Sequence, residues 1–153
     1  MSLLNNMNEN ATSYSGISAQ DELIRETVFA KIRQTECQWP IQIKLVPTAA
    51  LYFDQADLLI AADCCAFVHP TFHADCMSGK TTIVGCPKLD GVDYSEKLSA
   101  IFAENDIKSV TVARMEVPCC SGIVSAAKNA LSNAGKSIAC NVVTISINGE
   151  VID

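Results

Sequence analysis

Five of the eight cysteines stand directly after apolar segments that are expected to be strands: Cys64, Cys65, Cys86, Cys119 and Cys120. The three segments are residues 58–62, 81–85 and 109–115. Thiolates are the ligands of soft metals and iron–sulfur clusters, and they also attack disulfides. The positions of these cysteines therefore suggest a single thiolate site for a metal or a cluster, or a site of thiol–disulfide chemistry.

Local chemistry favours thiolates in two of these loops. Cys119 and Cys120 lie at the start of an expected helix, whose first N–H groups and macrodipole should lower the pKa of a cysteine. Gly122 permits a close approach of the backbone to a ligand. Lys88 follows Cys86 by two residues and could add positive charge there.

Other observations weaken this interpretation. The chain contains no Cys-x-x-Cys pair, which is the usual signal of zinc fingers and ferredoxin clusters. Adjacent cysteines rarely bind one metal with both sulfurs, and a free cysteine is often an ordinary core residue. Cys37, Cys76 and Cys140 lie away from the predicted strand ends, and we interpret them as structural.

The two histidines leave two alternatives open. His69 and His73 are four residues apart and precede Cys76, so the three could form a zinc-like set on one helix. The plainer alternative, which we prefer, is a helix-entry histidine and a surface or capping histidine. Asp63 and Asp90 could serve as acid–base groups or support metal ligands, but such aspartates more often cap loops.

The elements that must position these residues alternate between strand and helix. Besides the three segments above, strands are expected at residues 41–45 and 142–147, with a short hairpin at 150–153. Helices are expected at residues 19–34, 70–78, 94–104 and 120–134. The pattern predicts an α/β domain over residues 18–153 after a disordered leader or linker at 1–17.

We therefore expect a three-layer, Rossmann- or flavodoxin-like fold. Its open, mostly parallel sheet would have about five strands with helices on both faces. Ligands of such sheets bind beyond the carboxyl ends of the strands, where the five cysteines are predicted to lie.

Composition excludes several classes of partner. The 153 residues carry a net charge of −6 at a pI of about 4.8, without a basic cluster for nucleic acid or a membrane surface. No apolar run approaches the roughly 20 residues of a membrane span, and no secretory signal is evident. Nucleotide-binding and serine-hydrolase motifs are also absent from the sequence. We expect a cytoplasmic protein.

Four stretches resemble a known family: QWPIQIKLVP, ADLLIAADC, GCPKLD and MEVPCC, at residues 38–47, 56–64, 85–90 and 115–120. Over residues 36–153 the chain is similar to the C-terminal domain of bacterial ferredoxin-fused iron–sulfur cluster-binding proteins. In that family a ferredoxin module with two four-cysteine clusters precedes this domain. Residues 1–35 here contain no cysteine, so the module is missing from this chain.

The resemblance implies an electron-transfer accessory domain. It implies that a 4Fe-4S cluster, or a thiolate-bound metal such as zinc, is held by four cysteines with His73 as a further candidate ligand: Cys64, Cys86, Cys119 and Cys120. The implied partner is a ferredoxin module or another redox protein, and a second copy of the chain is a further candidate.

Two alternatives remain. In a thiol–disulfide oxidoreductase, Cys119 or Cys120 would attack a substrate disulfide, and Cys64 or Cys86 would resolve the intermediate. In a non-catalytic interaction domain, the thiols would be incidental core residues. Whether the protein is an enzyme stays open at this point.

Overall fold

The computed structural model describes residues 18–24 and 38–153, and the chain divides into two units, Met1–Arg33 and Gln34–Asp153. In the first unit residues 19–24 are helical, as predicted. The Asp21 N–H donates to Ser18 Oγ at 3.2 Å, and the Ser18 N–H donates to Asp21 Oδ2 at 3.2 Å, which is the reciprocal cap expected there. The predicted leader at 1–17, the rest of the helix to residue 34 and Cys37 lie outside the described residues.

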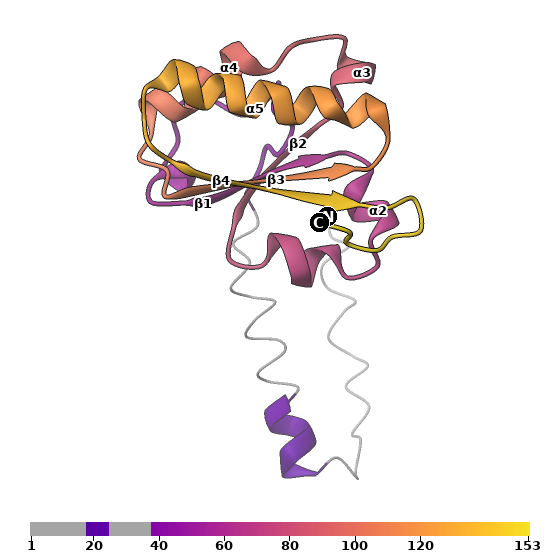
Figure 1. Ribbon diagram of the computed structural model, residues 1–153. Helices are drawn as coiled ribbons and strands as arrows, with labels where there is room; N and C mark the ends of the chain where they lie inside the picture. Colours follow the sequence, from indigo (N-terminus) through magenta and orange to yellow (C-terminus); the bar gives the residue numbers. More distant parts are fainter. Residues whose placement is uncertain (1–17, 25–37) are drawn as a thin grey trace, which may run out of the picture. The chain divides into compact units, whose positions relative to one another are not determined.

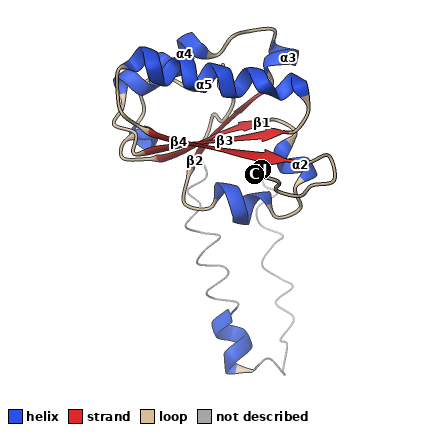
Figure 2. Ribbon diagram, in the orientation of Figure 1, coloured by secondary structure: helices blue, strands red, loops and turns tan. Residues whose placement is uncertain are grey.

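The second unit is built on a four-stranded, fully parallel sheet (Figure 2). Its strands are β1 (Asp57–Ala62), β2 (Thr81–Gly85), β3 (Ser109–Met115) and β4 (Ala139–Ile145), in the spatial order β2-β1-β3-β4. The predicted α/β fold with a parallel sheet is confirmed, with four strands instead of about five.

Strand β1 is central and buried on both faces, as its continuous apolar sequence indicates. Leu58 and Ile60 pack into one hydrophobic cluster, and Leu59 and Ala61 pack into the other. Each of these four side chains is at most 1% exposed. The alternation follows from the two-residue period of a strand, whose successive side chains point to opposite faces of the sheet.

Helices cover both faces of the sheet, but unequally (Figure 1). Helices α4 (Ser95–Glu104) and α5 (Ser121–Ala134) lie on one face, close to the predicted ranges. On the other face are α2 (Cys65–Val68) and a π-helical turn, His73–Met77. The shorter elements are η1 (Leu51–Phe53), α3 (Pro87–Asp90) and η3 (Pro118–Cys120).

The helix predicted over residues 70–78 is shorter than expected, since only the π-helical turn His73–Met77 lies in this range, and a separate helix precedes it. Helix α2 already begins at Cys65, and its last N–H bond runs from His69 to the Cys65 carbonyl at 3.0 Å. Pro70 then interrupts the helical ladder, since its nitrogen carries no hydrogen.

The strand predicted at residues 41–45 is also wrong. Only Gln42 forms a parallel bridge, with Val84 on the outer edge of β2. The N–H groups of Leu45 and Val46 then turn back to the Gln42 carbonyl at 2.8 and 3.0 Å. Ile43 and Val46 are both fully buried, while Leu45 is 66% exposed. Buried residues three positions apart are typical of a turn. The apolar residues at 41, 43 and 45 alternate like those of a strand, which is why a strand was expected.

The predicted C-terminal hairpin is confirmed as a short antiparallel return along β4. Ile145 bridges Val151, and the N–H of Ile152 donates to the Thr144 carbonyl at 2.9 Å. This return covers the end of an edge strand that would otherwise offer unpaired backbone groups. Among the residues described, no helix is long and apolar enough to cross a membrane.

Candidate thiol site at the carboxyl edge of the sheet

The order of the strands creates a switch point between β1 and β3. The connection from β1 to β2 runs through α2 on one face, and the connection from β3 to β4 runs through α5 on the other (Figure 1). The two chain segments therefore leave neighbouring strands in opposite directions. In open α/β sheets the crevice outside such a point is where ligands bind.

The three cysteine-bearing loops follow three adjacent strands, β2, β1 and β3. Ala62 pairs with Gly85, and the Asp63 N–H donates to the Gly85 carbonyl at 3.1 Å, so the ends of β1 and β2 are level. Helix α3 also contacts η3, and a Cβ placed on Gly122 would lie 3.4 Å from Pro87 Cβ. The structure thus brings the three loops together at one edge.

Gly122 lies beside the Pro87 ring of the Cys86 loop. An added Cβ would meet this ring at ordinary contact distance, 3.4 Å from Pro87 Cβ. The start of α5 and the loop after β2 are therefore neighbours at this edge.

The thiols of this edge differ in their exposure. Cys64 and Cys119 are exposed, Cys86 is half-buried, and Cys120 and Cys65 are 6% and 0% exposed. Burial, followed by the proximity of Cys120, raises the pKa of the Cys65 thiol to about 12. Burial also raises the pKa of Cys120, and the Cys119 and Cys64 side chains add to this effect.

The expectation that the helix start lowers the pKa of Cys120 is wrong. The η3 turn, closed by the Cys120 N–H bond to the Val117 carbonyl at 3.2 Å, directs this side chain into the cluster that contains Met115. Desolvation of a buried thiolate then outweighs the partial charge of the helix terminus.

A single metal ion does not fit these side chains as they lie. Across residues 18–24 and 38–153, no three His, Cys, Asp or Glu side chains are grouped so that they could hold one. Zinc–sulfur bonds of about 2.3 Å require sulfur atoms only about 3.8 Å apart. His73, which is exposed, belongs to no such group.

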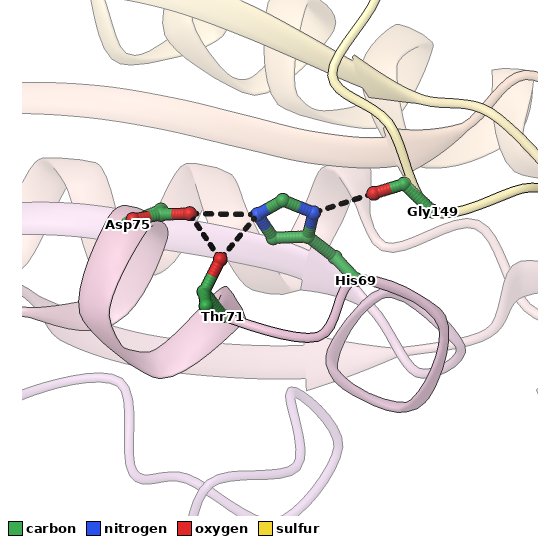
Figure 3. A network of polar contacts seen from close by, with 4 residues as sticks. All are labelled: His69, Thr71, Asp75 and Gly149. Atoms are coloured by element: carbon green, nitrogen blue, oxygen red, sulfur yellow. Dashed lines mark hydrogen bonds and ion pairs between the residues drawn. The ribbon is translucent and has the colours of Figure 1, made fainter.

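His69 is a structural residue, as the plainer of the two interpretations predicted (Figure 3). Its side chain is buried, Nδ1 contacts the Gly149 carbonyl at 2.6 Å, and Nε2 contacts Asp75 Oδ2 at 2.9 Å. The Thr71 hydroxyl donates to the same carboxylate oxygen at 2.5 Å. Both ring nitrogens are occupied, so the ring joins the turn after β4 to the segment after β1.

This network predicts a pH-dependent stability. The bond to Gly149, followed by the bond to Asp75, raises the pKa of His69 above its usual 6.5. The protonated ring donates from both nitrogens, whereas the neutral ring must face one acceptor with a lone pair. The contribution is therefore complete below about pH 6.5 and is lost as the pH rises through the raised pKa.

Urea denaturation at pH 6 and at pH 8.5 measures this effect. We expect the wild type to lose more stability between the two values than His69→Gln, with His73→Gln behaving like the wild type. Asp75, whose pKa is lowered by Thr71 and His69, stays ionised throughout this range. An equal loss in wild type and His69→Gln would show that the ring does not titrate in this network.

The two aspartates near the site stabilise loops. Asp90 Oδ2 accepts the Tyr94 hydroxyl at 2.5 Å, and Asp63 Oδ1 contacts Gln42 Nε2 at 3.4 Å. Burial, followed by the bond to Asp90, raises the pKa of Tyr94. A Cβ on Gly85 would lie 2.5 Å from the Tyr94 hydroxyl, so this tyrosine supports the turn that carries Cys86.

Two of the remaining cysteines are structural in their surroundings. Cys76 is 7% exposed in the cluster beneath α2, and burial raises its pKa. Cys140 is the second residue of β4, at the amino end of the strand and therefore at the opposite edge of the sheet. It provides a matched control for the thiols of the carboxyl edge.

Comparison with known proteins places the fold in a described family. The model of a family described as "Rossmann-like domain" matches residues 50–153. An uncharacterized protein of Archaeoglobus fulgidus is 33% identical over 115 residues, which cover 74% of this chain and 81% of that protein. No solved structure matches.

Proposed function

We propose that this chain, which belongs to the Rossmann-like domain family, is an electron-transfer accessory domain that binds an iron–sulfur cluster through four cysteines: Cys64, Cys86, Cys119 and Cys120. The observation that carries the proposal is the adjacency of the three strands that end in these cysteines. Their loops meet at the switch point, where the fold class binds its ligands.

The donor set favours a cluster over a single ion. Four thiolates are the usual ligands of a four-iron cluster, and each binds a different iron, so their sulfurs lie farther apart than around zinc. Burial, and after it the neighbouring Cys119 and Cys64, raises the pKa of Cys120, and bound iron would supply the compensating positive charge. When bound, the cluster would accept and donate single electrons.

The surroundings fit a role in electron transfer within a reducing cytoplasm. Cys64 and Cys119 are exposed, so a reductant or a partner protein could approach the site directly. A ferredoxin-type protein is the partner that we propose, on the basis of the family resemblance. Free thiols at this frequency are stable in the cytoplasm, where disulfides are rare.

Anaerobic reconstitution of the wild type tests the proposal. Metal-free protein is incubated with ferrous iron and sulfide under a reductant and is then desalted. We expect about four iron atoms per chain, as for one 4Fe-4S cluster, together with a visible absorption band that bleaches on reduction. Protein that emerges colourless and without iron, but folded by circular dichroism, would contradict the proposal.

One observation favours a second candidate, thiol–disulfide exchange. The exposed Cys119 stands beside the buried Cys120, and their side chains interact. An exposed attacking thiol with a protected neighbour suits such chemistry. Catalytic reduction of a small disulfide by metal-free protein, lost in Cys119→Ala, would favour this function over cluster binding.

A further inference from the structure

We infer that Cys65 and Cys120 form a reversible disulfide across the β1–β3 switch point when the metal-free protein meets a low-molecular-weight disulfide. Cys65 has no role in the proposed function. Yet it lies at the start of α2, directly after the exposed Cys64, and faces the layer that contains Cys120.

Chain geometry first excludes the obvious pairs. A disulfide ordinarily joins α-carbons 4.4–6.8 Å apart, whereas consecutive α-carbons are about 3.8 Å apart. The neighbouring pairs Cys64–Cys65 and Cys119–Cys120 are therefore poor candidates. A bond at this edge must instead link two different loops.

Packing then selects one pair of thiols. Cys64 and Cys119 are exposed and Cys86 is half-buried, while Cys65 and Cys120 belong to one packed cluster with Met115. Cys65 begins α2, and α2 contacts β3, the strand that leads to Cys120. Cys120 is thus the buried thiol that faces Cys65 across the β1–β3 switch point.

The exposure of the two thiols sets the order of the reaction. Cys120 keeps 6% of its surface exposed and Cys65 none, so the thiolate of Cys120 attacks the external disulfide first. One external thiolate leaves, and a mixed disulfide remains on Cys120. The thiolate of Cys65 then attacks the Cys120 sulfur and expels the second external thiolate. Two cysteines are oxidised, and one external disulfide is reduced to two thiols, which take up the two protons that the cysteines give up.

This bond would also control the proposed site. That consequence rests on the proposed function, because Cys120 is one of the four proposed cluster ligands. A Cys120 that is held in a disulfide has no thiolate to offer, so the oxidised chain could not hold the complete cluster. Oxidation and cluster binding would then exclude one another until a thiol reduces the bond.

Peptide mapping of the full chain tests the inference without any metal. Metal-free protein is incubated anaerobically with oxidised glutathione, alkylated, digested and analysed by mass spectrometry. The same treatment is given to the double variant Cys64→Ala/Cys119→Ala, in which the exposed thiols cannot contribute. We expect a disulfide between Cys65 and Cys120 as the main intrachain product in both proteins.

Single variants identify the order of events. In the double-variant background, Cys65→Ala should accumulate glutathione on Cys120, while Cys120→Ala should form no intrachain bond between the two loops. Cys76→Ala, which removes an equally buried thiol, should leave the bond unchanged. Circular dichroism confirms that each variant is folded. A main product that links Cys64 to Cys119, or Cys65 to Cys76, would overturn the inference.

A second measurement separates this inference from the proposed function. Oxidised and reduced wild-type protein are both reconstituted with iron and sulfide. If only the oxidised sample binds little iron, and dithiothreitol restores its iron content, the disulfide and the cluster exclude one another. No iron in either sample refutes the proposed function but leaves the mapped disulfide intact. Equal iron in the two samples, with the Cys65–Cys120 disulfide still present in the oxidised one, refutes the control of the site by this disulfide.

Discussion

Gly149→Ala is expected to lower the free energy of unfolding by about 3 kcal/mol, which is large for one methyl group. Gly149 has φ +88°, a conformation that costs about 1–2 kcal/mol for any L side chain. An added Cβ would also lie 2.5 Å from the Val68 carbonyl oxygen, which is backbone and cannot rotate away. The turn must shift, and the Gly149–His69 bond with it.

Gly135→Ala is the matched control for this prediction. Gly135 also has a positive φ, +65°, but nothing lies within 4 Å of the added Cβ. The free energy of unfolding of Gly135→Ala should therefore fall only by the cost of the backbone conformation, about 1 kcal/mol. Urea denaturation of the two variants measures the difference. Equal losses would show that the turn after β4 is not held tightly against the segment after β1.

Replacing the exposed thiols should have the largest effect on the proposed function. After anaerobic reconstitution, the wild type should bind about four iron atoms per chain, and Cys64→Ala and Cys119→Ala should each bind fewer than about one. The reason is that a cluster seldom survives the loss of a thiolate ligand. Both side chains are exposed, so their loss should leave the fold intact.

The control for these variants is Cys140→Ala, at the amino end of β4. It removes a half-buried thiol from the opposite edge of the sheet, and its iron content should equal that of the wild type. Iron and protein are measured on the same desalted samples. A similar loss of iron in Cys140→Ala would indicate non-specific binding of iron by thiols.

The sheet could be predicted because its strands have distinctive sequences. A continuous apolar run such as residues 58–62 fits an element covered on both faces, and the alternation of strands and helices along the chain implies parallel strands. Residues 41–45 misled the prediction because Ile43 and Leu45 alternate like a strand. The bonds of Leu45 and Val46 back to the Gln42 carbonyl reveal the turn.

The sequence predicts where the candidate site lies in the fold, but not which of its thiols are buried. The order of strands and cysteines was sufficient to bring three loops to one edge. Whether a thiol points outward or inward depends on the short turns α2 and η3, whose sequences carry no periodic signal. The sequence therefore places Cys65 at this edge without indicating that it is buried, and it does not indicate that Tyr94 supports the Gly85–Cys86 turn.

His69 illustrates the same limit in a different way. Its spacing to His73 and Cys76 was compatible with a metal site, and the plainer alternative proved correct. The deciding contact is with Gly149, 80 residues later in the chain. No local sequence pattern predicts a partner so far away in the chain, because the position of the turn after β4 depends on the assembled sheet.

Cys86 provides the most direct test of the central claim, because it alone brings a thiol from β2 to the site. The measurement is the iron content and visible absorption of Cys86→Ala after anaerobic reconstitution, beside the wild type and Cys140→Ala. If the three loops form one cluster site, Cys86→Ala loses most of its iron while Cys140→Ala keeps it. Iron and absorption equal to the wild type in Cys86→Ala would contradict a site shared by three strand ends.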